Sequence, residues 1–426
     1  MSAKASFMPM IIMGTLFFIF GFVTWLNGSL IPFLKIVCEL NDFEALFVTF
    51  AFYISYTVMA LPMAYILEKT GYKDGMALGL GVMAVGALLF IPAAQSAEFI
   101  IFLIALFTLG TGLTILQSAS NPYIVYLGPI ESAAARISIM GIINKSAGVL
   151  APLVFSALVF LDVGAYKEIT EASREVLAQK LIVPYIVMAL ILIVLIALIK
   201  FSSLENIVIK DEGLESEKNS IFEFPRLILG AIALFFYVGI EVIAGDTIAL
   251  YAQSIGMSDY TSLTSFTMSF MVLGYIVGIV FIPKYISQKM ALVLSAFFGI
   301  IFLFGVVFSS STSHVVSEIL WGWSGIRELP NTITFVALLG FANALVWPTI
   351  WPLALVGLGR HTAKGSALLI MAIAGGALFP LLFGKVAQVS QDMQTTYLIG
   401  IISYAFILFY ALIGHKISSW KNSDNA

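Results

Sequence analysis

Three ionisable residues, Lys145, Glu241 and Asp246, lie in stretches of the chain that are otherwise almost entirely apolar. A charged side chain at the centre of a bilayer costs at least about 2.5 kcal/mol on insertion scales unless it is paired or faces water. Two acids and one base leave one carboxylate without a fixed counter-charge, and such a carboxylate in a low dielectric binds a proton or a metal cation. We therefore predict that Lys145 neutralises one acid and that the other carries a coupling cation. A buried ion pair that only holds helices together is the alternative interpretation.

The two acids differ in how well they suit that role. They are five residues apart, which places them about 140° apart on an ideal helix, so they share one site only if Gly245 loosens the turn between them. Asp246 is expected to lie nearer the outer face, and its shorter side chain suits a compact ion site. We therefore predict that Asp246 exchanges a proton or a sodium ion, with Glu241 as the second candidate.

A second set of residues is polar but uncharged and lies at the depth of the membrane. Amide side chains offer a hydrogen-bond donor and an acceptor together, which matches sugar hydroxyls, and an indole face can stack on the apolar face of a sugar. This set predicts a binding site for a small neutral sugar. The alternative is that each amide joins two helices through an interhelical hydrogen bond. The predicted sugar-contacting residues are Asn27, Gln117, Asn121, Asn144, Asn343 and Trp347.

Other kinds of chemistry have few residues to carry them. Cys38 is the only cysteine, and His314, His361 and His415 lie far apart in polar connections, so the sequence predicts no disulfide and no firm metal site beyond sodium at Asp246. No nucleophile–base pair stands out, so no catalytic residue, no organic cofactor and no enzyme activity are expected. A net charge of -3 with scattered basic residues argues against nucleic-acid partners.

The elements that must position these residues are membrane-spanning helices. Of the 426 residues, 60% are hydrophobic and 11% are charged, whereas soluble domains carry roughly 25% charged residues. A helix needs about 20 apolar residues to cross the hydrocarbon core. The apolar runs predict an all-α membrane protein with twelve spans, at residues 8–34, 45–67, 75–95, 99–126, 133–161, 181–201, 225–252, 263–283, 290–309, 332–357, 365–388 and 397–414.

The longest strongly charged connection divides these spans six and six. It predicts an N-terminal six-helix bundle at 1–201, a cytoplasmic linker at 202–223 and a C-terminal six-helix bundle at 224–426. With the N-terminus in the cytoplasm, 14 Lys and Arg side chains fall inside, 6 outside and 1 within a span, which favours cytoplasmic positions for both termini. The first apolar run is longer than a signal-peptide core, so we expect it to be a retained span.

Longer motifs are spread over nearly the whole chain. They are Phe17-Phe18-Ile19-Phe20-Gly21-Phe22 with Leu26-Asn27 and Leu30-Ile31-Pro32, Gly71-Tyr72-Lys73 after Glu68, Gln117-Ser118-Ala119-Ser120-Asn121-Pro122-Tyr123 with Leu127-Gly128-Pro129, Arg136, Asn144, Tyr237-Val238-Gly239 with Glu241-Val242, and Pro348-Thr349-Ile350. In these motifs the sequence resembles the major facilitator superfamily, specifically its fucose:proton symporter branch of bacterial fucose and glucose/galactose permeases. The resemblance implies two pseudo-symmetric six-helix bundles that rock around one central sugar site, in a bacterial inner membrane.

The chain departs from that branch at two positions. Fucose permeases carry an acid directly after the asparagine of the first span, where this sequence has Gly28, and another acid in the fourth span, where it has Gln117. The proton carriers assigned to the fucose branch are therefore absent. Any coupling has to come from Glu241 or Asp246.

Together these features predict a cation-coupled importer of a monosaccharide such as glucose or galactose, working by alternating access as a monomer. Two alternatives remain open. One is a facilitative sugar uniporter, and the other, from a different class, is a non-transporting sugar sensor built on a transporter scaffold.

Overall fold

The computed structural model describes residues 7–128, 133–160, 170–207, 220–282, 284–358 and 361–420, and the regular structure within these ranges is entirely helical. Twelve of its helical segments are long and apolar enough to cross a membrane, which confirms the predicted count. These spans are Met8–Val37, Asp42–Ala60, Tyr65–Ser96, Phe99–Tyr126, Arg136–Val159, Ala172–Phe201, Pro225–Asp246, Thr264–Phe281, Gln288–Phe308, Asn331–Leu355, Lys364–Ser390 and Met393–Lys416. The sixth span begins earlier than predicted, because helix α7 (Glu171–Gln179) leads into α8 (Ile182–Phe201).

Several spans consist of two helices. The α-helices in chain order, besides α7 and α8, are α1 (Phe7–Trp25), α2 (Asn27–Val37), α3 (Asp42–Ala45), α4 (Phe47–Ser96), α5 (Phe99–Tyr126), α6 (Ala133–Phe155), α9 (Pro225–Asp246), α10 (Ile248–Ser254), α11 (Thr264–Phe281), α12 (Gln288–Phe308), α13 (Val315–Trp321), α14 (Asn331–Asn343), α15 (Val346–Leu355), α16 (Thr362–Met371), α17 (Gly375–Ser390), α18 (Met393–Thr396) and α19 (Gly400–Leu412). Helix α4 covers the second and third spans and turns at Gly71, whose positive φ of 73° suits glycine.

The predicted seventh span, 225–252, is interrupted at Thr247, between α9 and α10. A break in a membrane helix frees backbone carbonyls, which must find other donors because hydrocarbon offers none. Here α11 supplies them: the Thr264 hydroxyl donates to the Gly245 carbonyl at 2.7 Å, and the Thr267 hydroxyl donates to the Ala244 carbonyl at 3.1 Å. The interruption therefore lies beside Asp246, and α11 holds it in place.

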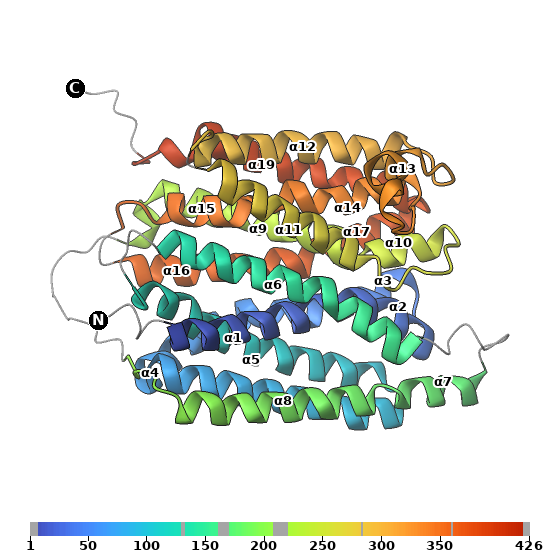
Figure 1. The fold of residues 1–426 in the computed structure, drawn as a ribbon, viewed down its shortest axis with the longest axis horizontal. Coiled ribbons are helices and arrows are strands. Elements are labelled where there is room, and N and C mark those ends of the chain that lie inside the picture. The colour runs from blue at the N-terminus through green and yellow to red at the C-terminus, as the bar shows by residue number, and fades with distance from the viewer. Residues whose placement is uncertain are drawn as a thin grey trace.

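The six spans before the linker and the six after it pack side by side (Figure 1). Helix α6 runs along α11 (Figure 1), and α4 packs against α17 and α16, so α6 and α4 both contact helices of the other half. Helix α1 begins and α19 ends at the same end of the molecule, which we call the terminal end; the opposite end, with α3, α7, α10 and α13, is the far end (Figure 1).

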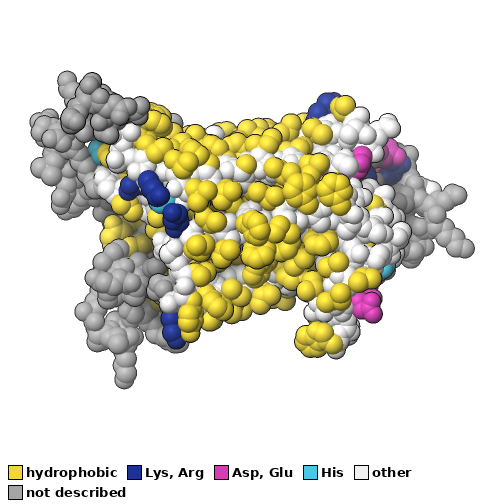
Figure 2. Space-filling model, turned by 90° about the horizontal axis from the view of Figure 1, so that it is seen from above, with side chains coloured by type: hydrophobic (Ala, Val, Ile, Leu, Met, Phe, Trp, Pro, Cys, Tyr) yellow, Lys and Arg dark blue, Asp and Glu magenta, His cyan; other side chains and the backbone are white. Residues whose placement is uncertain are grey.

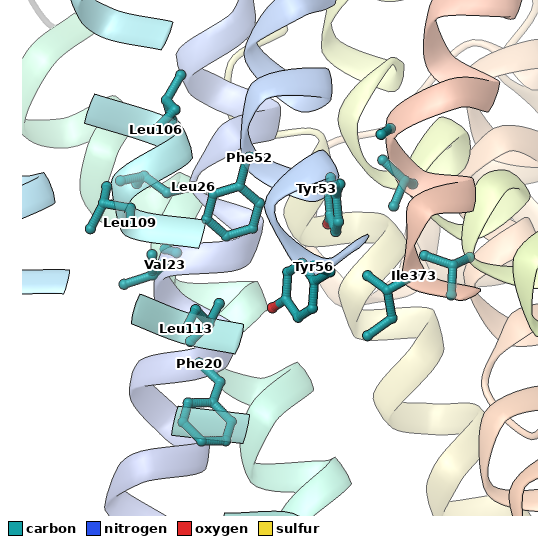
Figure 3. Close-up of a cluster of buried hydrophobic side chains, with 14 of the residues drawn as sticks. Phe20, Val23, Leu26, Phe52, Tyr53, Tyr56, Leu106, Leu109, Leu113 and Ile373 are labelled. Carbon is teal, nitrogen blue, oxygen red and sulfur yellow. The ribbon is translucent and has the colours of Figure 1, made fainter. Parts of the chain in front are cut away.

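Apolar side chains form both the core and the flank of the molecule. In the N-terminal half, Phe20 of α1, Phe52 of α4 and Leu109 of α5 belong to one buried cluster, and Tyr53 and Tyr56 of α4 face Ile373 of the other half (Figure 3). Figure 2 shows that charged side chains gather at the two ends, while the visible flank is apolar. Such a flank suits lipid hydrocarbon as its surroundings.

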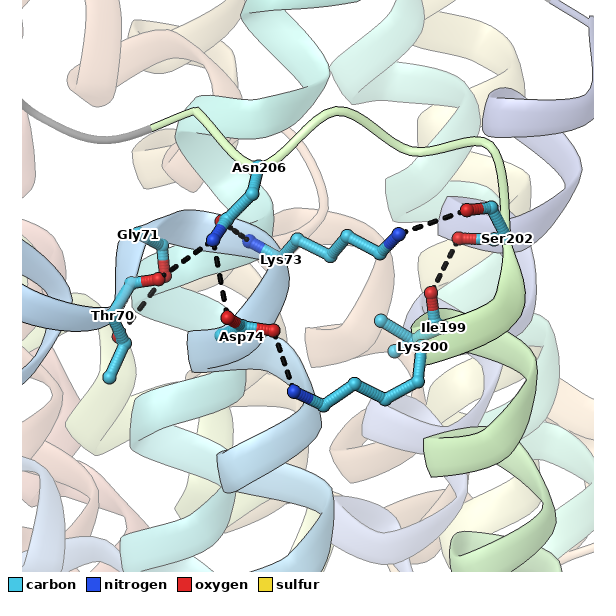
Figure 4. Close-up of polar contacts among 8 residues, drawn as sticks. All are labelled: Thr70, Gly71, Lys73, Asp74, Ile199, Lys200, Ser202 and Asn206. Atoms are coloured by element: carbon cyan, nitrogen blue, oxygen red, sulfur yellow. Dashed lines mark hydrogen bonds and ion pairs between the residues drawn. The ribbon is translucent and has the colours of Figure 1, made fainter.

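The beginning of the linker is fixed to the terminal end of the N-terminal half (Figure 4). The Asn206 amide donates to the Thr70 carbonyl at 3.0 Å and accepts from the Lys73 backbone N–H at 3.0 Å. Lys200 pairs with Asp74 at 2.7 Å. Residues 208–219 of the predicted linker lie outside the described ranges.

Candidate functional site

Lys145 and Glu241 form an ion pair between the two halves. The Lys145 Nζ, from α6, lies 2.6 Å from the Glu241 Oε1, from α9, and the two residues are only 8% and 7% exposed. The same Nζ lies 4.5 Å from the ring centroid of Trp25, so a cation–π contact adds to the ion pair. Of the two acids that the sequence offers as partners, Glu241 is therefore the one that neutralises Lys145.

Asp246 is the acid left over, and it is completely buried. Its Oδ2 accepts a long hydrogen bond of 3.4 Å from the Thr49 hydroxyl, whereas its Oδ1 has no hydrogen-bond partner. Among the described residues, no basic side chain forms an ion pair with it. A buried carboxylate atom without a partner is costly. The arrangement suits a group that gains stability when it binds a proton or a cation.

Trp25 lies in a slot between the halves that two glycines make possible. A Cβ on Gly148 of α6 would lie 2.6 Å from the Trp25 Cδ1, and a Cβ on Gly245 of α9 would collide with the other side of the indole. Met268 of α11 completes the contact. Trp25 and Thr49 were not predicted as part of the charge site, because their partners Lys145 and Asp246 are remote in the chain.

Three of the predicted sugar-contacting amides each make a hydrogen bond to a residue of their own half. The Asn144 Nδ2 donates to the Phe17 carbonyl at 3.2 Å, and the Asn343 Oδ1 accepts from the Tyr404 hydroxyl at 2.9 Å. The Gln117 Nε2 donates to the Tyr56 hydroxyl at 2.9 Å. These are the contacts that the interhelical interpretation of the amides expects. The fully buried Asn343 retains an unpartnered Nδ2, and Gln117 remains half-buried.

The other three predicted contacts differ in their surroundings. Asn27 is buried near the start of α2, and its Nδ2 has no partner. Asn121 is half-buried and makes no hydrogen bond to another described side chain. Trp347 is also half-buried; its ring stacks at 5.2 Å and 27° on Trp351 and lies 6.3 Å from Tyr237. Free amide groups and a partly open indole are suited to a hydroxylated ligand.

No group of three or more His, Cys, Asp or Glu side chains comes together in the described part of the chain. The groups of this site that can exchange charge are therefore single carboxylates and one ammonium.

Residues 13–380 match the family model described as Major Facilitator Superfamily. The chain belongs to this superfamily. The predicted family is thereby confirmed, and with it a transporter rather than an enzyme. The fold class is likewise the predicted one: an all-α membrane protein of twelve spans in two six-helix bundles.

The similarity to known relatives extends over nearly the whole length of the chain. A glucose/galactose transporter of Brucella abortus is 36% identical over 94% of this chain and 92% of its own. An L-fucose-proton symporter of Escherichia coli is 26% identical over 96% and 93%. Among solved structures, the superfamily transporter FucP in its outward conformation has a TM-score of 0.72 at 22% identity, over 95% of this chain and 98% of its own.

Gly28, at the position where the resemblance to fucose permeases implies an acid, packs closely against the other half. A Cβ on Gly28 would collide with the Thr264 hydroxyl and lie 3.1 Å from the Gly245 carbonyl, both from the other half. The neighbouring Ser29 hydroxyl donates to the Thr261 carbonyl at 2.6 Å. The halves thus meet at the far end around Gly28, where an acidic side chain would have no room in this conformation.

Proposed function

We propose that this protein is a cation-coupled monosaccharide importer of the glucose or galactose type. The observation that carries the proposal is the arrangement of charge between the halves. One acid is neutralised by Lys145, whereas Asp246 is buried with an unpartnered oxygen. A cation-coupled carrier needs one such charge that can be neutralised. The coupling cation binds this charge more tightly in one conformation than in the other, so its binding and release shift the equilibrium between them.

The proposed sugar site lies between the halves and takes a neutral substrate. Asn27, Gln117, Asn121, Asn144 and Asn343 would contact hydroxyls, and Trp347 would stack on the sugar ring. The free amide groups of Asn27 and Asn343 and the half-buried Asn121 support this assignment. Glucose and galactose are favoured over fucose because the first relative reported above is named for them.

Asp246 is the proposed ion carrier, with Glu241 held to Lys145. The relatives named as proton symporters make a proton the first choice for the coupling ion, and sodium is the second. Thr49 would hold the empty carboxylate during the step in which the carrier returns without its ion.

In the proposed orientation, the terminal end faces the cytoplasm and the far end faces the outside of a bacterial inner membrane. The bundles 1–201 and 224–426 rock against each other as two bodies joined by the linker 202–223. Contact around Gly28 closes the outer side. The protein works as a monomer, without a cofactor other than the coupling cation and without nucleic-acid partners.

The test is uptake of labelled sugars into proteoliposomes under an imposed gradient of protons or of sodium. We expect accumulation of glucose or galactose that depends on one of the two gradients. Uptake that only equilibrates would identify a uniporter, and binding without uptake would identify a sensor. Accumulation of a carboxylated or cationic solute, with aldohexoses ignored, would contradict the proposed sugar site.

A further inference from the structure

A short helix at the far end lies beside the membrane-spanning part of the molecule. Helix α13 belongs to the connection between α12, which ends at Phe308, and α14, which begins at Asn331. Its Trp321 is 8% exposed, and its ring lies 5.9 Å from both Phe266 and Phe270. These two phenylalanines are in the first two turns of α11, so α13 lies at the level where this span begins, rather than projecting beyond it.

The face of α13 that points away from the protein is apolar. Ile319 lies about 160° around the helix from the inward-facing Trp321, and it is 73% exposed. Val315 and Leu320 flank it and are also exposed, and the adjoining Trp323 is 84% exposed. In a connection surrounded by water this face would be expected to be polar. We call these four side chains the α13 apolar face.

We propose that the α13 apolar face is an interaction surface for lipid, inserted at the boundary between headgroups and acyl chains in the leaflet at the far end. Two observations favour lipid over other occupants. Trp321 ties the helix to the side of α11, whose Leu273 and Ile276 continue the apolar surface deeper into the bilayer. Tryptophan is also enriched where hydrocarbon meets water, because its ring is apolar and its N–H is polar.

Such a helix acts as an anchor lying in the membrane interface. It belongs to the C-terminal half, so it would fix the depth of that half at the far end. The polar residues of α13 leave the apolar face undivided, since Ser317 is buried against the protein and Glu318 lies on one edge. The inference depends on the fold and not on which solute is carried.

Spin labels on single cysteines can test the proposal in the whole protein. The only native cysteine is first replaced, as Cys38→Ser, and labels are attached at Ile319→Cys and Trp323→Cys in vesicles of phosphatidylethanolamine and phosphatidylglycerol. Collision with oxygen, which concentrates in lipid, is compared with collision with a water-soluble nickel chelate. Controls are Ser258→Cys, exposed in another far-end connection, and Ile279→Cys, exposed on the flank of α11.

We expect the ratio of oxygen to nickel collisions at positions 319 and 323 to be several-fold higher than at 258 and to approach that at 279. A ratio equal to that at 258 would overturn the proposal, because the face would then be in water. Weak collision with both reagents, with dipolar broadening between labels on different molecules, would overturn it in favour of a second copy. Unchanged uptake by each labelled variant would confirm that the fold is intact.

Discussion

At the scale of single residues, two acids five positions apart on α9 occupy different electrostatic environments. Glu241 has an ammonium at 2.6 Å, and Asp246 has one hydroxyl at 3.4 Å. We therefore expect Asp246→Asn to abolish accumulation of sugar against a gradient, while exchange of labelled for unlabelled sugar continues, because the amide cannot release a proton. Concentrative uptake equal to that of the parent would remove Asp246 from the coupling mechanism.

Glu241→Gln should behave differently, because it leaves Lys145 charged and buried without its partner. Removing one member of a buried ion pair costs about 3–5 kcal/mol in soluble proteins. We expect a lower unfolding temperature in detergent for Glu241→Gln than for Asp246→Asn. The matched control is the double variant Lys145→Met with Glu241→Met, in which stability should largely return. Equal stability of both single variants would argue against the ion pair as a structural contact.

Among the amides, Asn121 and Asn144 make a matched pair. Asn121→Ala should weaken sugar binding by about 1–3 kcal/mol, or roughly 5- to 150-fold, because the substrate loses a buried hydrogen-bond partner. Asn144→Ala should also lower thermal stability in the absence of sugar, since Asn144 holds the Phe17 carbonyl. Titration of sugar binding and thermal unfolding measure the two effects. Parental affinity in Asn121→Ala would leave that residue without a role in the site.

At the scale of helices, the close approach of α2 to α9 and α11 depends on the absence of a side chain at position 28. Gly28→Ala should keep the far end from closing and stop transport, while sugar still binds from that side, because the methyl group meets the Thr264 hydroxyl. Thr264→Ala in the same molecule leaves the Gly245 carbonyl oxygen 3.1 Å and the residue 264 Cβ 3.2 Å from the new methyl, distances that a small shift relieves, so part of the transport should return. Full transport by Gly28→Ala alone would contradict this closure.

The sequence predicted the spans better than it predicted their interruptions. A run of about 20 apolar residues is a local signal, and all twelve spans were found from it. The break at Thr247 is stabilised by hydroxyl donors from α11, a separate helix that follows further along the chain. No local sequence pattern marks the break. The same limit applies to the site: depth singled out Lys145, Glu241 and Asp246, but which acid pairs with Lys145 is decided by packing between the halves.

In the whole molecule, the ion pair of Lys145 with Glu241 and the buried Asp246 lie between the two halves, which we propose rock against each other. The resemblance to the fucose branch implies acids in the first and fourth spans, where this chain has Gly28 and Gln117; its carboxylates at membrane depth lie on α9 of the other half. Moving the charge from one half to the other leaves the principle of coupling intact, because a site between the halves is exposed to each side in turn.

The most direct test of this account is the cation flux that sugar itself drives. Purified protein in vesicles without any imposed gradient receives glucose or galactose outside, and internal pH and internal sodium are recorded together. We expect sugar entry to carry one of these cations inward in the parent, and we expect Asp246→Asn to carry neither although it still exchanges labelled sugar. Sugar entry in the parent with no movement of either cation would contradict it.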